Sequence, residues 1–473
     1  MIEKDFGDWL SPILVKEIRQ GFRSRVFTLA FLLIQGFMIF CVVIGLISAE
    51  GDFTDESGFF WTIIDVPLLL LMPCLGFGVL GSEIRSSTME LLFLTRLSAW
   101  RIVLGKWTAI VAQSVLIVCA VLPYMVLRYF IGGVNLLGDL EALGWVLYAS
   151  ALLTGLTIAI SPYCRTMLST VLMAIVSIVL VIVAMSWLQS PIIGHGAPGP
   201  IALIALVLGP LVLLMMFELA VTRIAPAAEN HAFRKRLLGF LIIGAIGALY
   251  YFSGRTARIL LPLGVILLLP VCIASLCEEI KPIPSIYLPF VKRGVLGQLA
   301  GMVFYPGWTS GLVFTILVYA GFIGIFYDGK QVIDEEGRLM LVSLAGALIM
   351  PLAVEKLFFG KLKKPAVVYF ALQAFMFIAF LLARVLKDGP LSGWMSLVAP
   401  LPTSVLFLGT TNDIDNSDAH FFLLAVGVVL IGTLVVLAIK SIGARREIAA
   451  QEKIARETLM NPGTPELAHA SAA

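Results

Sequence analysis

The lysines and arginines of this chain fall mainly into alternate gaps between long apolar segments, a pattern that constrains the fold more than any motif. A bilayer core about 30 Å thick needs about 20 apolar residues for one helical crossing. Twelve segments meet or approach that length, which predicts an all-α polytopic membrane protein. The predicted crossings are 26–48, 60–80, 102–126, 143–160, 167–188, 200–221, 237–252, 259–277, 309–327, 339–355, 366–383 and 420–439.

The basic residues also predict how the chain is oriented. With the N-terminus in the cytoplasm, the cytoplasmic gaps and the two tails hold 26 of the 33 lysines and arginines. Cytoplasmic loops retain positive charge, so both termini are expected in the cytoplasm. Hydrophobic residues make up 60% of the chain and charged residues 13%, which excludes a water-soluble globule. No basic stripe carries interleaved aromatic residues, so nucleic acid is not expected as a partner.

Residues 1–25 are predicted to form an amphipathic helix that lies in the membrane interface. Apolar and charged residues separate with a helical period in the segment WLSPILVKEIRQGFRSR. The charged side would face the head groups of membrane lipids, and it carries Lys16, Glu17, Arg19 and Arg23. A simple orientation anchor and a moving elbow helix both fit this pattern.

The crossings fall into two blocks of six. The blocks are 26–221 and 237–439, joined by a basic cytoplasmic linker at 222–236 and followed by a cytoplasmic tail at 440–473. The tripeptides Glu83–Arg85 and Glu279–Lys281 each follow the second crossing of a block, a similarity that favours a duplication. In the tail, residues 441–459 have the composition of a short solvated helix, and the last residues are expected to be disordered.

One further apolar stretch, 391–410, is not predicted to cross the membrane. A thirteenth crossing would place the basic C-terminal tail on the opposite side from the other basic segments. Pro400 and Pro402 also interrupt a regular helix in the middle of the stretch. A broken, re-entrant or outer-surface element is therefore expected here.

Signals for catalysis are nearly absent. The four histidines are scattered, and none has a carboxylate or cysteine at a spacing that suits a metal. The phosphate-binding motif GxxxxGK[ST] does not occur, because Gly105-Lys106 lacks the upstream glycine and the following hydroxyl. We therefore expect no enzyme activity, no metal and no bound cofactor in this chain.

Asp65 is the best candidate for an ionisable residue inside a crossing. Such residues usually mark ion pathways, which gives Asp65 one interpretation. The other interpretation places Asp65 near the outer interface, or as a cap where the helix resumes after a break before Pro67. Glu218 lies near the cytoplasmic end of its predicted crossing, and a surface ion pair with Arg223 is expected there.

The segment GSEIRSSTMELLFLTRLSAWRIVLGK, residues 81–106, is the cytoplasmic gap with the densest signal. Ser87 and Glu90 have the spacing of a capping box, so a new helix is expected to begin there, with leucines along one side. Ser98 is expected to cap the third crossing. A lever moved by a soluble partner and a plain interfacial linker helix both fit this segment.

An ordered set of residues in this gap matches a known motif. The set comprises Glu83, Ser87, Thr88, Met89, Glu90, Leu91, Leu92, Thr95, Leu97, Ser98 and Ile102–Lys106. In order and offset it resembles the loop after the second crossing of type-2 ABC transporter permeases, with Ser87 in place of a glycine and Arg96 in place of a proline. Pro12–Arg19 also resembles the N-terminal elbow helix of that family, and Ser161–Thr166 would form the next cytoplasmic loop.

This resemblance implies the membrane subunit of an ABC exporter in the cytoplasmic membrane of a prokaryote. In such permeases the loop is a coupling helix that docks on a separate ATP-binding subunit, which holds ATP and magnesium. The residues that would contact that subunit are Glu83, Arg85, Ser87, Thr88, Glu90 and Thr95. The substrate stays open, as does the question of whether a homodimer or a second permease completes the pathway.

Two other functions stay open on the residues alone. An ion-coupled secondary transporter with two six-helix halves would need charges at the membrane midplane, for which Asp65 is the candidate. A polytopic lipid-modifying enzyme would need acids, histidines or nucleophiles gathered at one interface, and none stand out in the sequence.

Overall fold

A computed structural model describes most of the chain. The described residues are 12–47, 56–85, 98–131, 135–163, 199–226, 229–253, 257–326, 335–360, 365–386, 398–410 and 416–460. Helices make up nearly all of them, with no strand among them, which confirms the all-α prediction for this part of the chain. The chain divides into two compact units, Met1–Pro226 and Ala227–Ala473. The division falls inside the segment 222–236 that was predicted as a linker, although α-helix occupies both ends of that segment.

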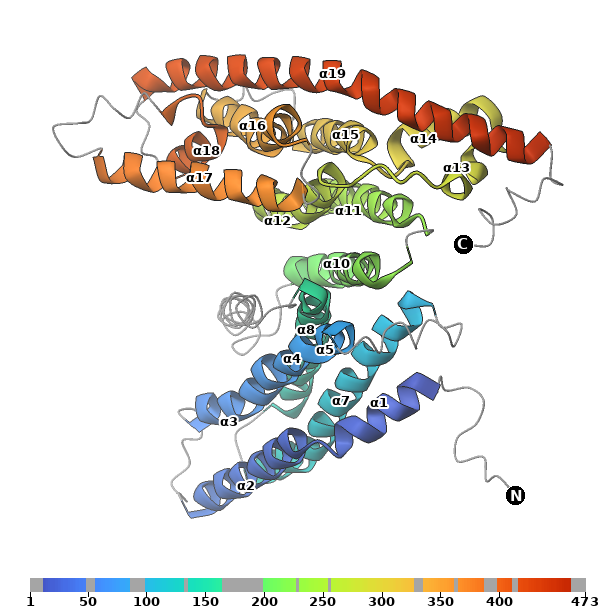
Figure 1. Ribbon diagram of the computed structural model, residues 1–473. Helices are drawn as coiled ribbons and strands as arrows, with labels where there is room; N and C mark the ends of the chain where they lie inside the picture. The colour runs from blue at the N-terminus through green and yellow to red at the C-terminus, as the bar shows by residue number, and fades with distance from the viewer. Residues whose placement is uncertain are drawn as a thin grey trace. The chain divides into compact units, whose positions relative to one another are not determined.

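The first unit is arranged around one long helix, α7. Its helices are α1 (Pro12–Phe22), α2 (Arg25–Ile47), α3 (Glu56–Asp65), η1 (Val66–Leu71), α4 (Met72–Leu75), η2 (Gly76–Gly78), α5 (Val79–Arg85), α7 (Ala99–Ile131), α8 (Leu136–Ile160), η3 (Ser161–Tyr163) and α10 (Gly199–Ile224). Helix α7 packs against α1, α2, α4, α8 and α10, so it contacts every long helix described in this unit (Figure 1).

The second unit is spanned by its last helix, α19. Its helices are α11 (His231–Ser253), α12 (Ala257–Leu276), α13 (Pro284–Val291), α14 (Gly294–Phe304), α15 (Trp308–Phe326), α16 (Glu335–Phe358), α17 (Pro365–Leu386), α18 (Pro402–Thr410) and α19 (Asn416–Met460). Helix α19 lies along α16, α15 and α13, while α15 also packs against α11 and α12 (Figure 1).

Nine helices in the described residues are long and apolar enough to cross a membrane, and they match nine of the predicted crossings. Of the other three, 26–48 corresponds to α2, which passes the same test only together with α1. The predicted crossing 259–277 corresponds to α12, whose apolar part, Pro262–Leu276, is short. The predicted crossing 167–188 lies outside the described residues. The chain is therefore a helical membrane protein, and the total of twelve crossings stays a prediction.

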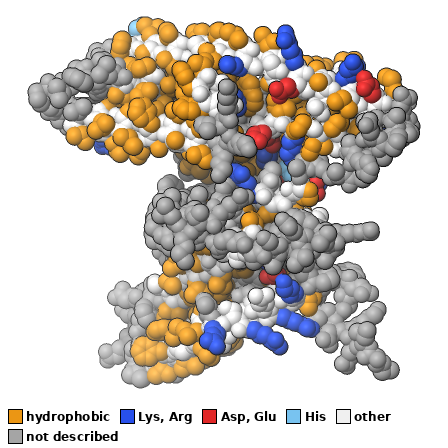
Figure 2. Space-filling view, in the orientation of Figure 1, with side chains coloured by type: hydrophobic (Ala, Val, Ile, Leu, Met, Phe, Trp, Pro, Cys, Tyr) orange, Lys and Arg blue, Asp and Glu red, His pale blue; other side chains and the backbone are white. Residues whose placement is uncertain are grey.

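Large apolar side chains cover the outward faces of these helices. On α19, for example, Val428, Ile431 and Val435 are 69%, 65% and 53% exposed. Figure 2 shows hydrophobic side chains over much of the described surface of the second unit. In water a continuous surface of this kind would drive aggregation, whereas lipid chains solvate it. The exposed faces of the helices are thus the faces expected to contact lipid.

The second crossing is an interrupted helix. The amide of Met72 donates to the carbonyl of Pro67, a five-residue step that defines the π-helical turn η1. With the same five-residue spacing, the amide of residue 73 would donate to the carbonyl of Leu68, but residue 73 is a proline and has no N–H. The Ser150 hydroxyl of α8 donates to the Leu68 carbonyl at 2.6 Å instead. A side chain from the neighbouring helix thus repairs the break.

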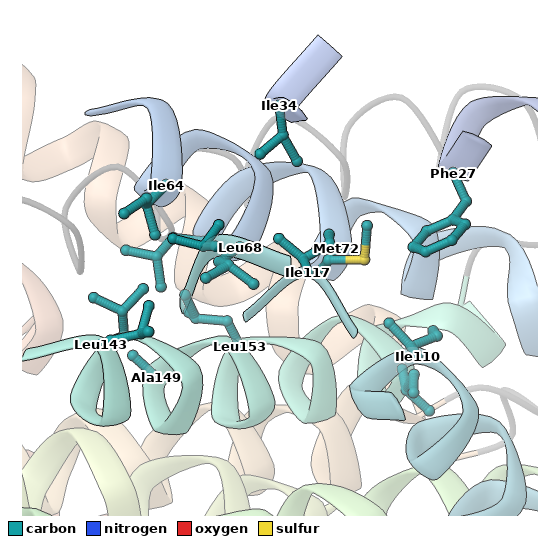
Figure 3. Packing of buried hydrophobic residues seen from close by; sticks show 14 of the residues in the cluster. Phe27, Ile34, Ile64, Leu68, Met72, Ile110, Ile117, Leu143, Ala149 and Leu153 are labelled. Carbon is teal, nitrogen blue, oxygen red and sulfur yellow. The ribbon is translucent and has the colours of Figure 1, made fainter. Parts of the chain in front are cut away.

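The interrupted helix and α8 pack face to face within the core of the first unit, to which α2, α7 and α10 also contribute. In Figure 3 the side chains of the interrupted helix lie opposite those of α8, and the facing residues are Ile64, Leu68, Met72, Leu143, Ala149 and Leu153. At Gly76 the helices lie so close that a Cβ atom would lie 2.3 Å from the Thr157 hydroxyl oxygen. A larger residue there would require the Thr157 side chain to move, and glycine avoids this contact.

A second proline break, at Pro351 in α16, is repaired from α17. Proline cannot donate to the carbonyl of Ala347, four residues earlier. The Gln373 side-chain amide donates to that carbonyl at 2.6 Å, and the Tyr369 hydroxyl donates to the carbonyl of Leu348 at 2.9 Å. These two bonds fix α17 against the break in α16.

Helix α18 covers the described part of the stretch 391–410. It begins at Pro402, in the first turn of a helix, where the missing N–H of proline costs least. Its nine residues are too few to cross a bilayer, in agreement with the prediction that 391–410 is not a crossing. The helix packs against α16 and α17, and the Thr403 hydroxyl donates to Gln373 Oε1 at 2.8 Å. Residues 391–397 lie outside the described part of the chain.

The last predicted crossing, 420–439, and the predicted tail helix, 441–459, form one continuous helix, α19. Its 45 residues give it a length of about 68 Å, roughly twice the thickness of a bilayer core. The prediction of a separate, solvated tail helix is wrong, because Ile448 and Ala455 are buried in a cluster with residues of α13. The apolar positions in the tail are spaced to pack, which its overall polar composition obscured.

Replacing Gln373 by Leu is expected to lower the thermal unfolding midpoint in detergent, because the Ala347 carbonyl loses its donor. The expected cost is on the order of 1 kcal/mol. In a Pro351→Ala background the backbone can supply that donor, so the cost of Gln373→Leu should shrink. Unfolding midpoints of the two single variants and the double variant form the test. Equal costs in both backgrounds would contradict the repair of the proline break by Gln373.

Candidate functional site

Three charged residues from three helices meet at one point of the first unit. Lys106 of α7 places its Nζ atom 2.7 Å from Glu83 Oε1 of α5 and 3.2 Å from Glu17 Oε1 of α1. The lysine side chain is 4% exposed, and the two glutamates are 17% and 18% exposed. Charge-assisted contacts of this kind are strong when water is largely excluded. We refer to Glu17, Glu83 and Lys106 as the lysine cluster.

The lysine cluster depends on close packing of α1 against α7. A Cβ atom at Gly21 of α1 would lie 2.1 Å from the side-chain nitrogen of Gln113 in α7, so a larger residue there would require the end of the Gln113 side chain to move. Helix α1 is bent by 56° from α2, between Leu14–Phe22 and Phe27–Val43. The bend lets α1 lie against α7 while α2 continues in another direction.

The charged side of α1 is divided between two environments. Lys16, Arg19 and Arg23 are exposed, as expected for a side that faces lipid head groups. The prediction that placed Glu17 with them is wrong, because Glu17 is turned toward α7 and forms an ion pair with Lys106. Helical periodicity alone could not separate Glu17 from its neighbours, since the position of α7 decides its contact.

The two helices that flank residues 86–97 are fixed by contacts of their own. The Ser98 hydroxyl accepts a hydrogen bond from the amide of Arg101 at 3.4 Å, which confirms Ser98 as the cap of α7. The Ser161 hydroxyl, after α8, accepts hydrogen bonds from the amides of Leu80 and Gly81 at 2.9 and 3.1 Å. These two amides lie at the start of α5, where a helix lacks internal acceptors.

Glu218 of α10 is buried among aromatic residues of α7. The Trp100 indole donates to Glu218 Oε2 at 2.8 Å, and the Trp107 indole donates to the carbonyl of Ala151 at 2.9 Å. The ring of Phe217 meets both indoles edge to face, with centroids 6.1 and 5.4 Å apart. The predicted surface position of Glu218 is wrong, since its side chain is 0% exposed.

Most of the predicted docking residues lie outside the described part of the chain. This holds for Ser87, Thr88, Glu90 and Thr95, and for the helix that the capping box predicts. Arg85 is the last residue of α5, and only its backbone is described. Their contact with an ATP-binding subunit stays a prediction.

Asp65 is buried at the point where the second crossing changes from an α-helix to a π-helical turn. Its side chain is 1% exposed. The residue has helical backbone angles and makes no capping hydrogen bond to the turn, so the predicted capping role is wrong. Single π-helical turns are frequent at functional sites. Asp65 therefore remains the candidate for a buried titratable group in a membrane-spanning helix.

A second buried ion pair, in the second unit, was not predicted from the sequence. Arg236 of α11 is 0% exposed, and its Nη2 atom lies 2.7 Å from Glu278 Oε2. Lys235 Nζ lies 3.1 Å from Glu278 Oε1. Arg236 Nη1 donates to the carbonyls of Val303 and Tyr305 at 2.6 and 2.7 Å, at the end of α14. A cation at these unsatisfied carbonyls stabilises the end of the helix.

The similar tripeptides of the two blocks do not lead to similar contacts. In the second unit Glu278 forms the ion pairs, rather than Glu279 of the tripeptide. The partners of Glu278 precede it in the chain, whereas Lys106, the partner of Glu83, follows. The sequence did contain a signal for this ion pair. Lys235-Arg236 lies near the start of α11 and Glu278-Glu279 follows α12, and these two apolar helices pack together.

The lysine cluster is better suited to mechanical coupling between helices than to catalysis. Among the described residues, no group of three or more histidine, cysteine, aspartate and glutamate side chains could hold a metal ion. The cluster instead joins one cation to two anions on three separate helices. Comparison with protein families, curated proteins and solved structures finds no match to this chain.

Neutralising both carboxylates of the lysine cluster is expected to cost more than the sum of the two single changes. Glu17→Gln and Glu83→Gln each leave Lys106 with one carboxylate, so each should cost about 1 kcal/mol. The double variant leaves a buried lysine without a counter-charge, with an expected cost of about 3 to 5 kcal/mol. Thermal unfolding of the four proteins in detergent measures the coupling. Additive, small costs would show that the three residues are not one unit.

Proposed function

We propose that this chain is the membrane-spanning subunit of an ATP-driven exporter, and that a separate subunit hydrolyses ATP. The observation that carries the proposal is the lysine cluster. It joins α1 to α5 and α7, the two helices that flank residues 86–97. A soluble subunit that displaced this segment would act on three helices at once.

The interrupted second crossing supports such a displacement. Between α3 and α5 the chain passes through a π-helical turn and a 3-10 turn, and Pro67 and Pro73 fall within this stretch. Interruptions of this kind let one part of a helix tilt relative to the other. Movement of α5 would therefore reach α1 through Lys106, and it would reach α2 through the bend that follows α1.

The resemblance of residues 81–106 to type-2 ABC permeases supports the nature of the partner. The partner would be an ABC ATP-binding subunit that holds Mg·ATP and docks on the 86–97 segment. The distribution of basic residues favours a cytoplasmic location for this segment, where ATP is present. This chain would supply the translocation pathway, alone or with a second copy or a second permease.

An ion-coupled secondary transporter is the second candidate function. The observation that favours it is the buried carboxyl of Asp65 inside a membrane-spanning helix. A buried carboxyl of this kind is thinner support than a cluster that connects three helices. A lipid-modifying enzyme has no comparable observation in its favour among the described residues.

Charge reversal at Glu90 is expected to separate the chain from its ATPase. The tagged wild-type chain, purified from its native membranes, should carry a P-loop ATPase in fixed stoichiometry. Glu90→Lys should reduce the associated Mg·ATP hydrolysis by about tenfold, because a reversed charge at a docking surface weakens association. Glu457→Lys is the matched control, since it makes the same change at an exposed position of α19. No ATPase on the wild-type chain, or equal losses in both variants, would refute the proposal.

Replacing Asp65 by Asn distinguishes the exporter from the ion-coupled transporter. Asparagine keeps the size of the buried side chain but cannot carry or release a proton. If ATP drives transport, hydrolysis by the purified complex should stay within about twofold of the wild type, because this change is far smaller than one that removes a catalytic group. Proton uptake by vesicles that contain the chain without any ATPase, lost in Asp65→Asn, would instead establish the ion-coupled function.

A further inference from the structure

Helix α14 of the second unit carries an apolar face that none of the described residues covers. Val295, Leu296, Leu299 and Met302 are 73%, 79%, 54% and 52% exposed. The eleven residues of α14 include no charged side chain, and Gln298 is the only one with a polar side chain. A fully apolar helix face of this kind needs a partner that can solvate it.

The opposite face of α14 is held firmly, so the exposed face has a fixed direction. The helix packs against α13 and α15. Arg236 binds the carbonyls at its C-terminal end. The Tyr305 hydroxyl, directly after the helix, donates to Glu452 Oε1 of α19 at 2.6 Å. Burial and the nearby carboxylate of Glu452 raise the pKa of Tyr305, so the phenol keeps the proton that it donates.

The end of α14 packs against two helices that are apolar enough to cross a membrane. The ring of Phe304 lies 5.0 Å from that of Phe233 and 6.2 Å from that of Phe240, both in α11. The ring of Phe240 in turn lies 5.1 Å from that of Phe314 in α15. Helices α11 and α15 are both apolar enough to cross a membrane. Aromatic contacts thus link the last turn of α14 directly to α11 and, through Phe240, to α15.

Positive charge lies at the other end of α14. Lys292 and Arg293 are exposed and directly precede the helix, in the turn between α13 and α14. In Figure 2 the charged side chains of the second unit gather on the half that carries α13, α14 and the C-terminal part of α19. The helix thus runs from an exposed basic turn to an aromatic contact with a helix that is apolar enough to cross a membrane.

We propose that α14, with Lys292 and Arg293, binds the surface of one lipid leaflet. The exposed apolar side chains lie among lipid acyl chains, and the two cations bind anionic head groups. With the predicted orientation of the chain, this is the cytoplasmic leaflet. The absence of charge along α14 and its continuity with α15 favour lipid over a soluble protein as the occupant. The inference does not depend on the proposed ATP-driven function.

The first test measures the surroundings of Leu296 in lipid discs. In a full-length variant without its six native cysteines, an environment-sensitive fluorophore is attached at Leu296→Cys. Leu317→Cys, on the exposed face of α15, is the lipid reference, and Ala449→Cys, exposed on the C-terminal half of α19, is the aqueous reference. Nitroxide on lipid acyl chains should quench Leu296 as it quenches Leu317. Quenching by aqueous iodide, as at Ala449, would show that this face contacts water and would overturn the proposal.

The second test measures the preference for anionic lipid. Adding phosphatidylglycerol to phosphatidylcholine discs should raise the thermal unfolding midpoint of the full chain, and Lys292→Gln with Arg293→Gln should remove most of that rise. The exchange Lys292→Arg with Arg293→Lys keeps both charges and should retain it. An equal rise in all three proteins would overturn the assignment of the two cations.

If the labelled Leu296 variant of the first test does not fold, Met302→Cys provides a second reporter on the same face.

Discussion

Lipid offers no hydrogen bonds to a polypeptide backbone, and this constraint accounts for many of the polar contacts inside both units. Each proline that removes an amide from a crossing leaves a carbonyl in need of a donor. Ser150 supplies that donor to the Leu68 carbonyl, and Gln373 supplies it to the Ala347 carbonyl. Both donors come from a neighbouring helix, so the repair of a break also fixes the packing of two helices. The same hydrogen bonds therefore satisfy the carbonyls at the interruptions and hold neighbouring helices together.

The same constraint brings the buried charges into contact with one another. Lys106 lies between two carboxylates, and Arg236 lies between a carboxylate and the carbonyls at the end of α14. Each arrangement connects helices that are separated in the chain by a loop. Such contacts are costly to break singly, because a charge without a partner would stay buried. They therefore make good points for transmitting movement, which is the role proposed for the lysine cluster.

Two features, one in each unit, would govern how the chain works in a membrane. In the first unit the buried lysine cluster joins α1 to α5 and α7, the two helices that flank residues 86–97, so the proposed partner would act on all three. In the second unit, α14 offers an apolar face next to a basic turn, which suits contact with a leaflet. The rigid helix α19 supports α14 through the bond between Tyr305 and Glu452. The lysine cluster would receive the force of the partner, and α14 would hold its unit against the lipid.

The sequence by itself determined the class of fold, since hydrophobicity is a property of each segment. The run 366–383 became α17, Pro365–Leu386, and the described part of the proline-interrupted stretch 391–410 holds only the short helix α18. Within the candidate site, Glu83, Lys106 and the Ser98 cap could be named because motif spacing marks them. Only the tertiary structure decided that Glu17 faces Lys106, that α19 is continuous, and that Arg236 pairs with Glu278. These features depend on which helices are neighbours, and periodicity along one helix carries no information about its neighbours.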